Sequence, residues 1–141
     1  MASVDKVVVY VDGGSRGNPG DSACGVYACD AADNRVAAFG RFLGRMTNNE
    51  AEYSGLLAAL EWARSAGVRE LHVRADSQLM VRQMNGQYRV KSANLRPLFE
   101  DARRRADQFA RFEIEHVRRE DNAEADRLAN LAMDARATVE G

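Results

Sequence analysis

The clearest apolar pattern lies near the N-terminus, where residues 7–11 are all β-branched or aromatic. Such a run predicts a buried β-strand. The strand is expected to end at Asp12, which two glycines follow, and the Gly- and Pro-rich residues 15–22 predict a loop. Two further strands are predicted at residues 23–31 and 35–43, joined by a turn at Asp33 and Asn34. Short connections of this kind favour an antiparallel arrangement of the first three strands.

Helical spacing replaces this pattern after residue 47, where Tyr53, Leu56, Leu57, Leu60 and Ala63 recur until Gly67. The remainder predicts a strand at 69–75, a short helix at 77–85, a helix at 95–109, a strand at 111–117 and a helix from a cap at Asp121 and Asn122 to about residue 136. This order predicts an α/β fold with a five-stranded mixed sheet and helices on both faces.

Composition narrows the class of protein. A chain of 141 residues, 45% of them hydrophobic, predicts one domain, residues 1–141, that buries its own core. The net charge of −1 gives no global positive field, so any binding of nucleic acid must come from a local patch. Cys24 and Cys29 are an odd number of residues apart on a predicted strand, which favours two separate buried thiols in a reducing compartment. The apolar run at the N-terminus is too short for a leader or a membrane span, so we expect a cytoplasmic protein.

Two acidic residues stand where predicted strands end. Asp12 follows the first strand and Asp76 the fourth, where Ser77 opens a helix. Each has an ordinary explanation, a turn for Asp12 and a helix cap for Asp76. The alternative for both is a functional group held at the edge of the sheet.

Two more acids are placed on helices. Glu52 shares a face with apolar residues of the helix after residue 47, although its spacing from Asn49 also fits a capping box. Asp126 lies near the apolar face of the last helix, where its ordinary explanation is an ion pair with Arg119 or Arg127. Together, the four acids could meet at one end of the sheet. Because clustered carboxylates repel, a divalent cation would remove the conflict, and oxygen ligands without a Cys or His pair favour magnesium or manganese over zinc.

Four motifs in order carry a family resemblance. They are DGGSRGNPG at residues 12–20, TNNEAE at 47–52, ADSQ at 75–78 and DNAEADRLAN at 121–130, and with them the chain resembles the type I ribonuclease H family over nearly its whole length. The resemblance implies a ribonuclease H-like fold and an endonuclease that cuts the RNA strand of RNA/DNA hybrids, leaving 5′-phosphate and 3′-hydroxyl ends. Asp12, Glu52, Asp76 and Asp126 match the family's four catalytic carboxylates, which hold two Mg²⁺ ions, with Mn²⁺ as an alternative.

The resemblance also implies substrate contacts. Gly13, Asn18, Asn48, Asn49 and Gln78 match positions at the minor groove of the hybrid, where 2′-hydroxyls distinguish RNA from DNA. Arg45 and Thr47 match a pocket for a phosphate of the DNA strand, whose third member is Ser92 here instead of the asparagine of many relatives. Residues 85–95 are too few for the basic protrusion that some relatives carry, and Tyr88, Arg89 and Lys91 are its candidate replacements or simply an exposed turn.

Histidine placement departs from the family pattern. Many relatives carry a mobile histidine before the last carboxylate, whereas this loop reads Arg118-Arg119-Glu120-Asp121. Alignment on the strand favours a structural role for His116, with Arg118 or Arg119 on the product side, and His72 is expected to be structural.

Two alternatives to this function are a DNA-cutting relative of the same fold and a non-catalytic binding module. The TNN and DSQ motifs speak against the first, and the repulsive carboxylates against the second. We expect a monomer without a membrane segment.

Overall fold

The computed structural model describes residues 4–141, so the first three residues of the predicted domain lie outside the described part. The elements follow the predicted order, with one addition at the end. They are β1 (Lys6–Gly17), β2 (Gly20–Asp30), β3 (Arg35–Met46), α1 (Asn48–Ser65), β4 (Glu70–Ala75), α2 (Gln78–Met84), α3 (Arg96–Ala106), β5 (Arg111–His116), a 3₁₀ turn (Arg119–Asp121), α4 (Ala123–Ala135) and β6 (Val139–Glu140).

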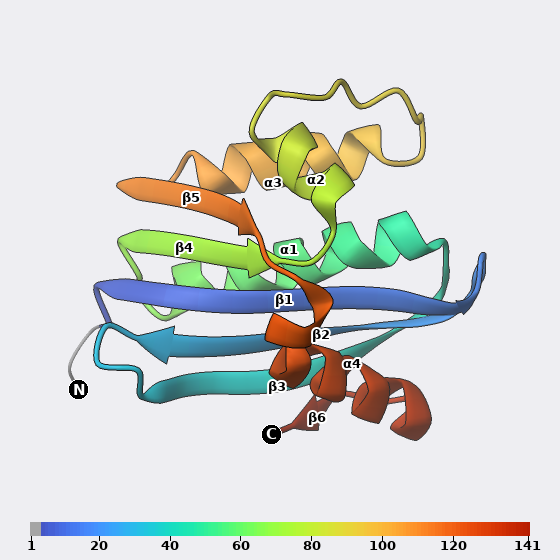
Figure 1. Ribbon diagram of the computed structural model, residues 1–141, viewed down its shortest axis with the longest axis horizontal. Coiled ribbons are helices and arrows are strands. Elements are labelled where there is room, and N and C mark those ends of the chain that lie inside the picture. The colour runs from blue at the N-terminus through green and yellow to red at the C-terminus, as the bar shows by residue number, and fades with distance from the viewer. Residues whose placement is uncertain (1–3) are drawn as a thin grey trace.

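The sheet is mixed, with the strand order β5-β4-β1-β2-β3-β6 (Figure 1). As predicted, β1, β2 and β3 are antiparallel, and β4 pairs in parallel with β1 and β5 with β4. The predicted number of five strands is wrong, because Val139 and Glu140 pair with Gly40 and Phe39 and form a sixth. Two residues are too few to show the alternation that reveals a strand in a sequence.

The predicted loop at residues 15–22 is also wrong. β1 and β2 remain paired out to Gly17 and Gly20, so the two strands form one long hairpin that projects past the rest of the sheet (Figure 1). Glycine at position 20 permits this tight end, because a Cβ there would lie 2.2 Å from the carbonyl oxygen of Arg16. The polar and glycine-rich composition reflects a hairpin exposed to solvent instead of an irregular loop.

Helices cover both faces of the sheet, as predicted. α4 lies on the near face in Figure 1 and α1 and α3 on the far face. Glycines in the strands allow the helices to approach closely: a Cβ on Gly13 would lie 2.1 Å from the carbonyl oxygen of Ala51 in α1, and one on Gly25 would lie 2.0 Å from that of Ala125 in α4. The ends of both helices that carry the predicted acids are thereby held against β1 and β2.

Helix α1 begins where the sequence predicted. Thr47 is its N-cap, with the hydroxyl accepting from the amide of Glu50, while the Glu50 carboxylate accepts from the amide of Thr47. Further along, the buried Tyr53 hydroxyl donates to Gln83 in α2 at 2.6 Å. This bond ties the short helix after β4 to α1. No helix in residues 4–141 is long and apolar enough to cross a membrane.

Candidate active site

Asp12 lies in the middle of β1 and not at its end as predicted. Parallel pairing with β4 stops at Val11 and Ala75, whereas antiparallel pairing with β2 continues past Asp12. The side chain accepts from the amide of Gly13 at 2.9 Å. Asp12 is therefore not a turn residue; it occupies the point at which the sheet opens between β1 and β4.

Asp76 directly follows the last residue of β4. Since Ala75 is in register with Val11, the parallel pairing places Asp76 beside Asp12. The cap of α2 is Ser77, whose hydroxyl accepts from the amide of Met80 at 3.3 Å. The helix-cap explanation for Asp76 is thus excluded, and its carboxylate is left facing the opening.

Glu52 reaches the same opening from the first turns of α1. Its capping-box explanation is excluded because Thr47 and Glu50 form that box. The amide nitrogen of Asn48 donates to the Glu52 carboxylate at 3.1 Å, and the Ser77 hydroxyl bonds to it as well. These bonds orient Glu52 toward the end of β4.

Asp126 arrives from α4 on the opposite face of the sheet. Its predicted ion pair with Arg127 is absent from residues 4–141, because Arg127 pairs with Glu124 at 3.0 Å. Instead, the Asp126 carboxyl lies next to that of Asp12, close enough to raise the pKa of Asp12. Arg119 lies in the same cleft as Asp126, without an ion pair to it in the described chain.

The four acids line one cleft of about 330 Å³. They come from β1, α1, α4 and the residue that follows β4. The cleft is completed by Gly13, Gly14, Ser15, Arg16, Asn48, Arg119, Asn130 and Met133. Within residues 4–141, no three carboxylate, Cys or His side chains are drawn together as a ready-made ligand cluster. The four carboxylates thus line one cleft without forming a closed set of ligands in the described chain.

Burial and mutual repulsion raise the free energy needed to ionise the carboxyl groups in this cleft. Burial, followed by the charge of Asp76 and the contact with Asp126, raises the pKa of Asp12 to about 8. Burial is also the main cause that raises the pKa of Glu52 to about 7, against the opposing hydrogen bond from Ser77. A cation in the cleft would favour the ionised form of both carboxyls.

The residues predicted to contact substrate surround this cleft. Asn18, at the hairpin end, accepts from the amide of Asn48 at 3.0 Å, so the hairpin is docked on the start of α1. Arg45, Asn49 and Gln78 are exposed. They lie at the end of β3 and at the first turns of α1 and α2.

Glycine is required at position 13 by the packing of α1 on β1, and not by contact with substrate. It is buried, and the space that its side chain would fill belongs to the backbone of Ala51. Gly14 is more open, with only the Asn48 side chain near its Cβ position, at 3.8 Å. The first glycine is required by helix packing, and the second leaves the backbone open toward the cleft.

Several residues of the cleft were not predicted from the sequence. Arg16 and Asn130 both line it, and Arg16 bonds to Asn130 and to Asp134. Asn130 lies one helical turn after Asp126, so helical spacing could have identified it. Arg16 gives no such signal, because it lies in the Gly- and Pro-rich stretch that predicts a loop.

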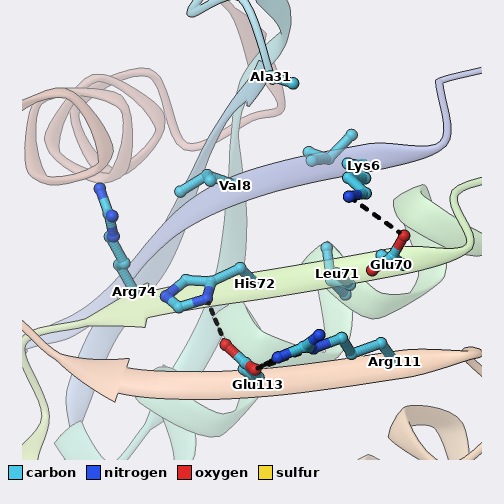
Figure 2. Close-up of a pocket in the computed structure, with 10 residues that line it drawn as sticks. Lys6, Val8, Ala31, Glu70, Leu71, His72, Arg74, Arg111 and Glu113 are labelled. Atoms are coloured by element: carbon cyan, nitrogen blue, oxygen red, sulfur yellow. Dashed lines mark hydrogen bonds and ion pairs between the residues drawn. The ribbon is translucent and has the colours of Figure 1, made fainter.

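Both histidines lie outside this cleft. His116 is the last residue of β5, as strand alignment predicted, and its side chain is exposed. His72 lies in a second hollow, of about 320 Å³, on the face of β4 and β5 that α4 leaves open (Figure 2). Its ring bonds to Glu113 at 3.1 Å and Glu115 at 2.8 Å, which ties β4 to β5 as its structural role requires.

Charges in this second hollow are internally paired. Figure 2 shows Lys6 beside Glu70 and Arg111 beside Glu113, with N–O distances of 3.7 and 2.7 Å. Arg74 likewise pairs with Glu115. Pairing of opposite charges in this way is typical of a solvated sheet surface. Among the described residues of this hollow, it leaves no excess charge that would attract a charged ligand.

The segment between α2 and α3 is short and contains no helix, consistent with the absence of a basic protrusion. Its Tyr88 is exposed, and Arg82 donates to the Tyr88 hydroxyl at 2.6 Å while its guanidinium lies over the ring. Arg89, Lys91 and Ser92 are all exposed. The segment therefore exposes an aromatic ring that Arg82 contacts, together with the cationic side chains of Arg89 and Lys91.

Comparisons with known proteins agree with this architecture. The family model described as "Reverse transcriptase-like" matches residues 10–132. "Bifunctional protein Rv2228c" of Mycobacterium tuberculosis is 47% identical over 133 residues, which cover 94% of this chain and 36% of the relative. "Ribonuclease HI" of Halobacterium salinarum is 42% identical over 129 residues, covering 92% of this chain and 65% of the relative. The chain thus spans roughly one third to two thirds of these curated relatives.

Solved structures give the same result. The crystal structure of RNase H1 from H. salinarum has a TM-score of 0.90 at 42% identity and covers 92% of this chain and 98% of that one. The N-terminal RNase H domain of Rv2228c has a TM-score of 0.89 at 46% identity, with coverages of 93% and 95%. LC11-RNase H1, isolated from compost, was solved in complex with an RNA/DNA hybrid; its TM-score is 0.88 at 38% identity, with coverages of 92% and 98%. On these matches, the chain belongs to the type I ribonuclease H family.

Proposed function

We propose that this chain is a metal-dependent endonuclease that hydrolyses the RNA strand of RNA/DNA hybrids and leaves 5′-phosphate and 3′-hydroxyl ends. The observation that carries the proposal is the convergence of Asp12, Glu52, Asp76 and Asp126 on one cleft from four separate parts of the chain. A module that only binds would gain nothing from burying carboxylates that repel one another. We expect it to act as a monomer in the cytoplasm.

The donor set of the cleft fits magnesium. Its side-chain oxygen donors include four carboxylates and the Asn48 amide, and no Cys or His of the described residues 4–141 lines it. We propose Asp12, Glu52, Asp76 and Asp126 as the ligands of two Mg²⁺ ions, with Mn²⁺ as a substitute. When bound, these ions supply Lewis acidity to the attacking water and to the leaving 3′-oxygen. The carboxylates position the ions and do not act as nucleophiles.

The polar rim of the cleft is proposed to read the hybrid. Gly13, Asn18, Asn48, Asn49 and Gln78 are the candidates for minor-groove contacts, where 2′-hydroxyls identify the RNA strand. Asn48 has a second task, since its amide nitrogen orients Glu52 while its oxygen accepts from the amide of Ser15 at 3.3 Å. The structure of LC11-RNase H1 with an RNA/DNA hybrid supports this class of substrate.

Arg45 and Thr47 are the candidates for gripping a phosphate of the DNA strand. Arg45 is exposed next to the start of α1. The Thr47 hydroxyl accepts a hydrogen bond in the capping box, so its proton remains available to a phosphate oxygen. The first amides of α1 favour a negative charge at the same place.

The proposal is tested with purified protein, Mg²⁺ and labelled duplexes. We expect cleavage of the RNA strand of an RNA/DNA hybrid, no cleavage of duplex DNA of the same sequence, and loss of activity in EDTA. End-labelling of the products should show 5′-phosphates and 3′-hydroxyls. Equal cleavage of duplex DNA or duplex RNA would contradict the assigned substrate, and retention of full activity in EDTA would contradict the metal requirement.

Arg119 and Arg118 should differ in their effect on cleavage. Arg119 lines the cleft, whereas Arg118 is outside it and lies 3.6 Å from Glu120. A guanidinium among carboxylates favours a bound phosphate, so Arg119→Gln should lower kcat/KM for the hybrid by about tenfold. Arg118→Gln, the matched control, should remain within about twofold of wild type. Equal losses in the two variants would rule out a particular role for Arg119.

A further inference from the structure

Asn122 is the one fully buried amide beside the candidate active site, in the described chain. Only 1% of its surface is exposed, and its side-chain nitrogen donates to the carbonyl oxygen of Val11 at 2.9 Å. The sequence predicted that Asn122 would cap α4, but its side chain makes no capping bond. The amide is used instead to join the start of α4 to β1.

This bond lies on a short path between two of the proposed ligands. Val11 directly precedes Asp12 in β1. On the other side, the carbonyl oxygen of Asn122 accepts from the amide of Asp126 at 3.1 Å. Asp12 and Asp126 are therefore connected through one side chain and two hydrogen bonds.

The remaining contacts between α4 and the sheet set the distance between them and not the position of α4 along its axis. Gly25 and Gly40 let the backbone of α4 rest on β2 and β3, with a Cβ on Gly40 only 2.2 Å from the carbonyl oxygen of Leu128. Backbone contact of this kind sets the distance between helix and sheet. The buried side chains of Leu128 and Met133 add apolar packing, which is not directional, whereas the Asn122 hydrogen bond is directional and therefore fixes where the start of α4 lies along β1.

The chemistry of the bond fixes the orientation of the amide. The carbonyl oxygen of Val11 can only accept, so the nitrogen of Asn122 must face it. The side-chain oxygen is then buried, with no hydrogen-bond partner among residues 4–141. An unpartnered buried oxygen is unfavourable, so asparagine at this position makes its bond to Val11 at a cost to folding stability.

We propose that Asn122 is a positioning residue that holds Asp126 in place relative to Asp12 across the cleft. The inference rests on the proposed function, in which both carboxylates hold the metal ions. It predicts that loss of the bond disturbs metal binding and turnover more than hybrid binding, which depends on the rim of the cleft.

Two variants test this role, with Gln108→Glu as a matched amide-to-acid control on the exposed surface after α3. Asn122→Asp replaces the donor with an acceptor that faces the Val11 carbonyl; Asn122→Ala removes the bond together with the unpartnered oxygen. For Asn122→Asp we expect kcat to fall about 100-fold with KM for the hybrid within about twofold, and for Asn122→Ala a fall in kcat of about tenfold. Calorimetric titration with Mn²⁺ in the absence of nucleic acid should show affinity at least about fivefold weaker in both.

All measurements are made well below the Tm of each variant, so that a purely structural role would leave kcat and Mn²⁺ affinity unchanged. If Asn122→Asp fails to fold, Asn122→Ala decides the question. Wild-type Mn²⁺ affinity and kcat in a folded variant would overturn the positioning role. If the wild-type protein fails to cleave the hybrid, the proposed function is wrong, and the Mn²⁺ titrations alone then decide for or against Asn122.

Discussion

Replacing Asp12 by asparagine is expected to lower hybrid cleavage by about 10³-fold while stabilising the metal-free protein at pH 8. The loss follows from the central position of Asp12, which lies beside Asp76 and next to Asp126. An amide keeps the shape of the side chain but carries no charge to hold a cation. The rate is measured with a labelled hybrid at saturating Mg²⁺.

The gain in stability follows from the sign of the pKa shift. Burial and the charge of Asp76 raise the pKa of Asp12 from 3.8 to about 8, so between these values the folded state holds a proton that the unfolded state has released. The free energy of unfolding of the metal-free wild type should therefore fall as the pH rises from about 4 to 8. The amide in D12N does not titrate and has no such dependence, so D12N in EDTA at pH 8 should be more stable by about 1–2 kcal/mol, or about 3–8 °C in Tm.

The matched control is Asp107→Asn, an exposed carboxylate paired with Arg103 at the end of α3. It should leave both cleavage and the pH dependence of Tm close to wild type. Mg²⁺ should raise the Tm of the wild type and of this control, and much less that of D12N. An undiminished rise in D12N would count against Asp12 as a ligand, and a lower Tm of D12N in EDTA would contradict the raised pKa.

The sequence predicted most of the fold because its apolar residues alternate or recur with a clear period. The run at residues 7–11 and the helical spacing from Tyr53 to Ala63 both correspond to observed elements. The errors fall where periodicity carries no information. The hairpin end is polar and glycine-rich because it projects into solvent, and β6 has only two residues.

The carboxylates of the site were predictable for a related reason. An acid on an apolar face, such as Glu52, violates the local pattern, and a violated pattern at several positions indicates a shared function. Asn122 escaped this reasoning because asparagine before a helix is ordinary, so its burial and its bond to Val11 appear only in three dimensions. Arg16 escaped for the opposite reason, since nothing distinguishes it from any exposed arginine.

Among substitutions that add a single methyl group to the α4 side of the sheet, Gly25→Ala should be the most destabilising. A Cβ on Gly25 would lie 2.0 Å from the carbonyl oxygen of Ala125 and 2.8 Å from the amide nitrogen of Ala129. Both are backbone atoms of α4, so no side chain can rotate away and the helix itself must move. We expect a loss of about 3 kcal/mol or more, or about 10 °C in Tm.

Gly14→Ala provides the control for stability, because its Cβ would have only the Asn48 side chain nearby, at 3.8 Å. It should leave Tm unchanged or slightly raised, as less freedom is lost on folding. An unchanged Tm in Gly25→Ala would show that α4 is not held against β2 as closely as the structure has it.

The same methyl group should also impair cleavage in the molecules that remain folded. Asp126 directly follows Ala125, the residue that the new Cβ would displace, so the carboxylate must move with the helix and away from Asp12. At temperatures well below its Tm, Gly25→Ala should therefore lose about 100-fold in kcat. If Gly25→Ala is destabilised but keeps full turnover, cleavage does not depend on the packing of α4. Asp126 is then not required at the position where the structure places it. Loss of both stability and turnover would mean that Gly25 supports catalysis by allowing α4, which carries Asp126, to pack closely on β2.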